Sequence, residues 1–307
     1  MTAARYAVSR EQLAGLISER HALVAEEMRA AARTLGIRQV HRARVAARTL
    51  RSVLATLRPL LRPALFERGR RDLRNAALEL GAIRESDVRR DWLVAFIAGT
   101  GTLPPGARQQ LLVALEAGRE EARGAFRNHV ASLAYRERLE RLDATLNDPR
   151  LVIASGELLP VVHERVVRRW KRLRKALRGH ARDAQSLHEI RLAAKHARYA
   201  SEVLLPLAGL DPRPHVKVLK RLQDCLGDHR DAEQALAWLE ALGEPLGPVL
   251  LAHLESPICR LLAKRERQLD RLRDRFDMPA DLRRWSSGAR ERISPARRRR
   301  AGQSSRS

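Results

Sequence analysis

Residues 40–51 read VHRARVAARTLR, and residues 187–198 read LHEIRLAAKHAR. Aligned at an offset of 147 residues, the two segments match at a histidine and three basic positions, and both carry an Ala-Ala pair before the second basic position. The matched pairs are His41 with His188, Arg44 with Arg191, Arg48 with Lys195, and Arg51 with Arg198. A proline follows each segment, at Pro59 and Pro206. This agreement predicts an internal duplication of the chain.

The match continues downstream when the offset changes to 146 residues. There the aligned pairs are Leu80-Gly81 with Leu226-Gly227, Arg84-Glu85 with Arg230-Asp231, and Trp92 with Trp238. A second set of basic residues also aligns, Arg71 with Lys217 and Arg74 with Lys220, and Arg221 follows directly. The duplication therefore extends well beyond the first segment.

Both segments are predicted to be helices, because they are rich in alanine and leucine and contain neither glycine nor proline. Basic positions at i, i+3, i+7 and i+10 fall within about 80° of one another at 100° per residue. Apolar positions such as Val40, Val45 and Leu50 lie outside this stripe. A row of like charges costs roughly 0.2–0.5 kcal/mol per neighbouring pair. We therefore expect an anion beside each row, either protein carboxylates or a ligand.

The duplicated pattern His-x-x-Arg-x-x-x-(Arg/Lys)-x-x-Arg resembles the CHAD domain, the conserved histidine α-helical domain. The resemblance covers roughly residues 10–275 and includes Leu80-Gly81-x-x-Arg84 and Leu222-Gln223-Asp224-x-Leu226-Gly227-x-x-x-Asp231. The sequence departs from the family pattern at Thr49 and His196, where a further basic residue is common, and at Glu85, where aspartate is usual. All eight aligned basic or histidine positions of the two motifs are retained.

This resemblance implies an all-α fold, with an internal duplication forming two antiparallel helical bundles related by a pseudo-two-fold and a basic channel or surface between them. It also implies binding of inorganic polyphosphate without a known catalytic activity. We expect no cofactor, and we expect a location in the cytoplasm in association with polyphosphate granules. The candidate polyphosphate-binding residues are His41, Arg44, Arg48, Arg51, Arg71, Arg74, His188, Arg191, Lys195, Arg198, Lys217, Lys220 and Arg221.

Composition points independently to a helical protein with a polyanionic partner. The 307-residue chain has 44% apolar but only 4% aromatic residues and lacks alternating strand-like runs, which favours an all-α class. A net charge of +24 favours a polyanion over a neutral metabolite. On charge alone nucleic acid, an anionic membrane surface and polyphosphate all remain open, as does a merely solvated basic surface.

Guanidinium groups bind phosphoryl oxygens in a bidentate manner and lysine adds a point charge, so a repeating phosphate polymer suits a repeated basic row. The histidines have two interpretations. Each is either a structural hydrogen-bond donor within the protein, or a hydrogen-bond donor to phosphate that gains a positive charge near pH 6.5. The alternative function is nonspecific nucleic-acid binding through the basic surface and the Arg-rich residues 297–300. The shortage of aromatic side chains for base stacking weakens that alternative.

Known enzyme motifs are missing from the sequence, including the P-loop, His-Glu-x-x-His and Gly-x-Ser-x-Gly. The motif segments supply cations with one carboxylate, Glu189, whereas phosphoryl transfer requires acidic metal ligands. We therefore expect no enzymatic activity and no metal site. Two cysteines without ligand spacing, expected to be buried thiols, indicate a reducing compartment. No segment has the length and apolarity of a signal peptide or a membrane span.

Proline, glycine and Asn-Asp-Pro signals divide the chain into a first helical half, residues 1–147, a second half, residues 148–276, and a basic, disordered tail, residues 277–307. Helices are predicted over residues 10–34, from after the turn at Gly36 to residue 57, over 63–80, 87–98, 107–146, 160–177 and 184–205, and from after the loop of residues 243–248 to about residue 274. Between the last two, one helix is predicted to end at Gly227 and another to begin at Asp228 or Asp231. Gly124 is a predicted break in the long fifth helix.

Overall fold

The computed structural model describes residues 9–99, 103, 106–153, 159–179, 183–206, 210–242, 248–277, 279 and 282. Within these ranges every regular element is a helix, so the predicted all-α class is confirmed; one isolated β-bridge joins Leu61 and Val152. The α-helices are α1 (Arg10–Thr34), α2 (Ile37–Leu57), α3 (Pro63–Glu79), α4 (Gly81–Gly99), α5 (Ala107–Ala131), α6 (Leu133–Leu146), α7 (Leu159–Arg178), α8 (Ala184–Leu204), α9 (Arg213–Leu242) and α10 (Pro248–Asp274). A short 3-10 helix follows α2 (Arg58–Leu60). None of the described helices is both long enough and apolar enough to span a bilayer.

The chain forms two compact units. Among the described residues, the larger unit contains those of 10–154 and 224–271, and the smaller unit contains Ser9 and those of 155–223 and 272–282. Residues 224–271 thus pack with the first half of the sequence. The division into sequence halves at residue 147 follows the repeat and stays a prediction, and most of the predicted tail lies outside the described residues.

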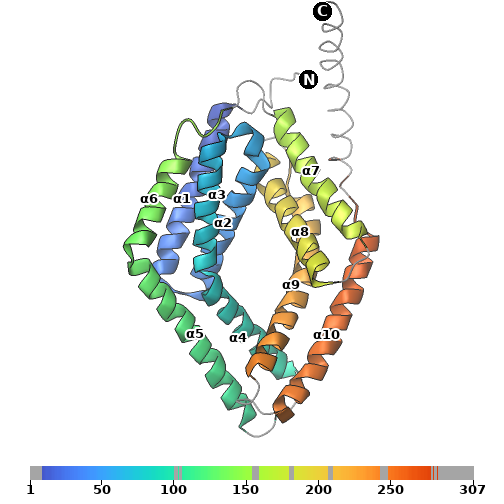
Figure 1. The fold of residues 1–307 in the computed structure, drawn as a ribbon. Coiled ribbons are helices and arrows are strands. Elements are labelled where there is room, and N and C mark those ends of the chain that lie inside the picture. The colour runs from blue at the N-terminus through green and yellow to red at the C-terminus, as the bar shows by residue number, and fades with distance from the viewer. Residues whose placement is uncertain are drawn as a thin grey trace, which may run out of the picture. The chain divides into compact units, whose positions relative to one another are not determined.

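In the larger unit, α2 packs against α1 and α3, and α6 packs against α3 and α1 (Figure 1). The buried side of α2 is a continuous apolar stripe, in which Val40, Ala43, Ala47, Leu50 and Leu54 are all 0% exposed. Their spacing follows the 3.6-residue period, so they occupy one face of the helix. The basic motif residues therefore lie beside or outside this core stripe.

A second apolar cluster of the larger unit gathers side chains from α4, α5, α10 and the second part of α9, including Leu93, Leu111, Leu239 and Leu254. Trp92 and Phe96 are half-buried against this cluster and stack on each other with ring centroids 4.8 Å apart. This cluster joins the two separate sequence segments of the unit, and a local sequence pattern does not reveal this contact.

One buried carboxylate ties α4 to α5. Asp87 is fully buried, and its Oδ1 accepts hydrogen bonds from Arg119 Nε at 3.0 Å and from Arg123 Nη2 at 3.4 Å. Arg119 Nη1 also donates to Glu116 Oε2 at 2.6 Å. Although burial opposes the change, the hydrogen bonds to Glu116 and Asp87 raise the pKa of Arg119. A buried charge with this many partners is a structural ion-pair network.

The smaller unit is built on the pairing of α7 with α8. Trp170 of α7 is fully buried, and its Nε1 donates to Ser201 Oγ of α8 at 2.9 Å, which satisfies the indole N–H away from water. The Phe276 ring stacks on Trp170 with centroids 5.9 Å apart. His163, 3% exposed, has a pKa lowered by burial to about 4 and is neutral at physiological pH.

Two predicted helix boundaries near glycines are wrong. The predicted break at Gly227 does not occur, because α9 continues through this glycine to Leu242. Where the prediction starts a helix at Asp87, α4 begins at Gly81, directly after the one-residue turn at Leu80. Glycine weakens a helix by only about 1 kcal/mol, so tertiary packing overrides it at both positions.

The break in the long helix of residues 107–146 occurs at Ser132, and Gly124 lies inside α5. Ser132 has an extended backbone, its hydroxyl accepts a hydrogen bond from Tyr135 N–H at 3.2 Å, and it caps α6. A serine cap therefore sets this boundary. Of the two cysteines predicted to be buried, Cys225 is buried but Cys259 is exposed.

Candidate functional site

The first motif row lies on α2 in the larger unit. His41 is exposed, Arg48 and Arg51 are half-buried, and Arg44 is only 8% exposed. The alanine, valine and leucine side chains of α2 are buried at helical spacing. The basic row lies along the edge of this buried face. The predicted row on α2 therefore contains three accessible residues and one buried residue, Arg44.

Arg44 is a tether between helices. Its Nη1 donates to the carbonyl oxygen of Ala77 at 2.6 Å, in the last turn of α3. This is a charge-assisted hydrogen bond to a carbonyl at the negative end of a helix dipole. Burial, together with the positive charge of Arg48, lowers the pKa of Arg44 to about 10, while Glu85 opposes the lowering. Arg44 is consequently a buried cation at neutral pH.

Gly81 lies against the end of the Arg44 side chain. A Cβ added at Gly81 would lie 3.4 Å from Arg44 Nη1, which is close to van der Waals contact. This close approach gives the matched Leu80-Gly81 pair a physical role that its sequence does not reveal. The pair places the start of α4 against the end of the Arg44 side chain.

Arg71 and Arg74 are exposed on α3, which packs against α2. Between them Asp72 and Leu73 are buried, so α3 presents its basic side chains to solvent on the face opposite to its core contacts. The larger unit thus collects the first-half candidates on two helices that pack against each other. Arg44, Arg48 and Arg51 come from α2, and Arg71 and Arg74 from α3.

The second motif row lies on α8 in the smaller unit. His188 is exposed, and Arg191, Lys195 and Arg198 are half-buried. The Arg198 guanidinium carbon lies 4.9 Å from the centroid of the buried Tyr199 ring. Such a cation–π contact holds the guanidinium group in place and leaves its edge able to donate hydrogen bonds.

The remaining candidates, Lys217, Lys220 and Arg221, are exposed on the first part of α9, while Leu219 and Leu222 in the same stretch are buried. This is the same arrangement as on α3, with cations outside and leucine inside. Each unit therefore contains one motif helix and one further helix with exposed basic residues.

The two motif helices have the same length and equivalent ends. Both contain 21 residues, and α8 begins and ends 147 positions after α2. Exposure also agrees at three of the four matched positions: the histidines are exposed, and the third and fourth members of each row are half-buried. The exception is Arg44, which is buried where Arg191 is half-buried.

Arg89 of α4 is a basic residue near the first row that the sequence prediction omits. It is half-buried, and its guanidinium carbon lies 5.1 Å from the centroid of the Trp238 ring. Burial lowers the pKa of Arg89, and Glu85 opposes the change. Glu85 therefore acts electrostatically on both Arg44 and Arg89, and its i, i+4 spacing to Arg89 is the sequence signal that would have identified this contact.

Arg and Lys side chains, and not metal-binding side chains, determine which ligands these rows can bind. Among the described residues, no group of three or more His, Cys, Asp or Glu side chains could hold a metal ion. The accessible arginines and lysines can donate many hydrogen bonds to an anion. Each row is thus suited to holding phosphate or a similar oxyanion.

Comparison with known proteins agrees with the motif. The family model of the CHAD domain matches residues 14–240. The fold is similar to the crystal structure of the CHAD domain from the plant Ricinus communis, with a TM-score of 0.67, 23% identity and coverage of 94% of each chain. It is also similar to PptA from Streptomyces chartreusis, with a TM-score of 0.70, 18% identity and coverage of 87% of this chain and 99% of that chain. A search of curated protein sequences found no match. Because the family model spans most of the sequence, the chain belongs to the CHAD domain family.

Proposed function

We propose that this protein binds inorganic polyphosphate through its duplicated basic rows and does not turn it over. The observation that carries the proposal is the repetition of one arrangement on α2 and α8: a histidine, then three basic residues, on helices with equivalent ends. A solvated basic face has no reason to recur with the same spacing and nearly the same exposure. A polymer with a charge at every unit can use many such contacts in series.

The chemistry of the rows supports phosphate as the ligand group. Arg48, Arg51, Arg191 and Lys195 are partly exposed, so a ligand reaches them without unfolding the helices. Half-burial also reduces competition from water and strengthens each charge-assisted hydrogen bond. Membership of the CHAD domain family supports the same ligand class.

We further propose that the two rows descend from one duplicated helical bundle related by a pseudo-two-fold, and that one polymer contacts both rows. The equal helix lengths and the constant offset support the duplication. Binding of one chain to two rows would raise affinity through effective concentration. The cytoplasm and polyphosphate granules stay the predicted location.

The composition of the motif segments supports the proposal that the protein does not turn polyphosphate over. The two motif segments contain one carboxylate, Glu189, and it lies outside the row, whereas phosphoryl transfer uses several acidic ligands to place metal ions beside the phosphates. Metal-dependent release of orthophosphate from polyphosphate by the purified protein would contradict this part of the proposal.

Competition with nucleic acid tests the ligand class. We expect single- and double-stranded DNA and RNA to displace labelled polyphosphate only at phosphate concentrations well above that of the polymer, because few aromatic side chains exist to stack bases. Displacement at equal phosphate concentration would favour the nucleic-acid alternative. A truncation after Ala296 provides the control, since it removes residues 297–300 but keeps Phe276, and it should lower nucleic-acid affinity while sparing polyphosphate.

A further inference from the structure

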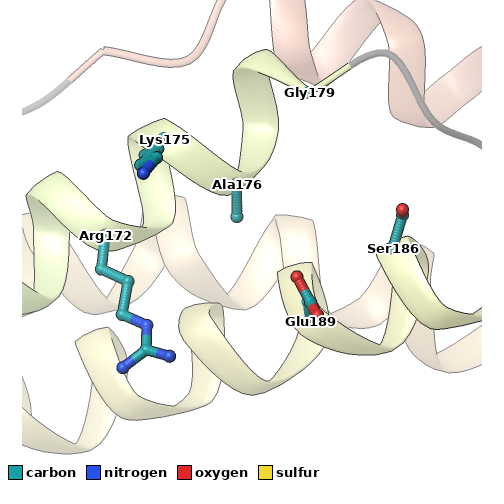
Figure 2. A pocket seen from close by; sticks show the side chains of 6 residues that line it. All are labelled: Arg172, Lys175, Ala176, Gly179, Ser186 and Glu189. Carbon is teal, nitrogen blue, oxygen red and sulfur yellow. The ribbon is translucent and has the colours of Figure 1, made fainter.

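A hollow of about 350 Å³ lies between α7 and α8 in the smaller unit. It is lined by Arg172, Lys175, Ala176 and Gly179 of α7 and by Ser186 and Glu189 of α8 (Figure 2). Its volume is within the range of about 300–1,000 Å³ that is typical of small-molecule sites. None of its lining residues belongs to the candidate polyphosphate-binding set.

The hollow is separate from the motif row of α8. At 100° per residue, Ser186 and Glu189 point roughly 170° away from the mean direction of His188, Arg191, Lys195 and Arg198. The buried residues Ile190 and Ala194 lie between the two directions and pack into the core of the unit. A ligand in the hollow therefore does not touch the row, and the row does not reach the hollow.

The two walls of the hollow differ in hydrogen-bonding character. Figure 2 shows Arg172 extending from α7 while Ser186 and Glu189 rise from α8. Guanidinium and ammonium groups only donate, so the α7 wall requires an anionic acceptor. Within the described part of the chain neither Arg172 nor Lys175 forms a hydrogen bond or an ion pair, and both are exposed.

The α8 wall requires a donor. The Glu189 carboxylate accepts one hydrogen bond, from Gln185 Nε2 at 3.2 Å, and as a carboxylate it has capacity for several more. The Ser186 hydroxyl donates to Asp183 Oδ2 at 2.9 Å, which leaves its oxygen as an acceptor. Asp183 also caps α8 by accepting from Ser186 N–H at 2.8 Å, and these bonds fix the Ser186 side chain.

Charge decides the class of ligand. The α7 wall carries two positive charges and the α8 wall one negative charge. Plain polyphosphate offers acceptor oxygens alone, so Glu189 would repel it. A phosphate dianion matches the Arg172 and Lys175 pair, and an amine or hydroxyl on the same molecule matches Glu189 and Ser186. We propose that this hollow binds a small phosphate monoester that carries an amino or hydroxyl group.

O-phosphoethanolamine is the test ligand, because it joins a phosphate dianion to one ammonium group and neutralises all three charges of the hollow. In calorimetric or NMR titrations of the full chain, we expect it to bind about tenfold more tightly than orthophosphate, and ethanolamine not to bind. The Glu189→Gln variant should lose this preference and keep its affinity for orthophosphate. The Arg172→Ala variant should lose affinity for both.

Two controls separate this site from the polyphosphate rows. Arg168→Ala removes an exposed cation one turn away on α7 and outside the hollow, so it should leave O-phosphoethanolamine binding unchanged. The Arg48→Ala/Arg51→Ala variant should also retain this binding, while Arg172→Ala retains polyphosphate binding. Equal affinity for O-phosphoethanolamine and orthophosphate in the unmodified protein would overturn the proposal. Tighter binding of glutamate than of O-phosphoethanolamine would also overturn it. The same holds if folded Glu189→Gln, with an unchanged melting temperature, still binds O-phosphoethanolamine more tightly than orthophosphate.

Discussion

Replacing Arg48 and Arg51 together with alanine is expected to weaken polyphosphate binding by about a hundredfold. Hydrogen bonds to charged groups contribute about 1.5–3 kcal/mol each, and partial exposure of both side chains places them at the lower end. Two such losses amount to about 3 kcal/mol, and every 1.4 kcal/mol is a factor of ten. Arg44 is kept in this variant because it is buried and bonded to Ala77, so its removal would also destabilise the fold. Equilibrium titration with labelled polymer at fixed salt measures the change.

The matched variant in the second motif is Lys195→Ala/Arg198→Ala, and we expect a loss of similar size. If one polymer contacts both rows, the two double replacements should be strongly non-additive on long polymer and closer to additive on short polymer. Arg29→Ala/Arg136→Ala removes the same charge from exposed positions outside the rows and should change affinity only slightly. A similar loss in this control would mean that net charge, and not the rows, holds the polymer.

Asp87→Asn is expected to lower the free energy of unfolding by about 3 kcal/mol, because removing one partner of a buried ion pair leaves the other charge uncompensated. Asp87 is fully buried and accepts from Arg119 and Arg123, while Arg119 keeps its bond to Glu116. Glu116→Gln is the matched control, since the Glu116 side chain is 49% exposed and should contribute less than about 1 kcal/mol. Urea unfolding curves for both variants provide the comparison. Equal stability of the two would contradict a buried structural role for Asp87.

Much of the helical architecture could be predicted from local patterns. The predicted bounds of the first helix, Arg10 to Thr34, and the last residues of α2 and α10, Leu57 and Asp274, agree with the structure. Proline marks helix boundaries at Pro59, Pro63 and Pro248 because it lacks an N–H and restricts its neighbour, although Pro257 lies inside α10. Glycine was a poorer guide, since Gly227 and Gly124 lie inside helices whose packing outweighs their small intrinsic penalty.

The motif residues of the candidate site could also be predicted, but their separate roles could not. Helical spacing placed Arg44, Arg48 and Arg51 on one stripe, and all three lie on α2 beside its core face. Only tertiary contacts distinguish buried Arg44, whose partner Ala77 is 33 residues away, from its accessible neighbours. The α7–α8 hollow cannot be predicted from the sequence, because it combines Arg172 and Glu189 from two different helices. Neither segment contains a known motif for a small-molecule site.

Direct titration with polyphosphate of defined chain lengths tests the central claim, that the duplicated rows bind this polymer. We expect affinity to rise with chain length and then level off once a chain occupies both rows, and to fall as salt increases because phosphate contacts release counterions. The Arg48→Ala/Arg51→Ala and Lys195→Ala/Arg198→Ala variants should each shift the whole curve to weaker binding. Absence of binding to folded protein at moderate salt, at every chain length, would contradict the account.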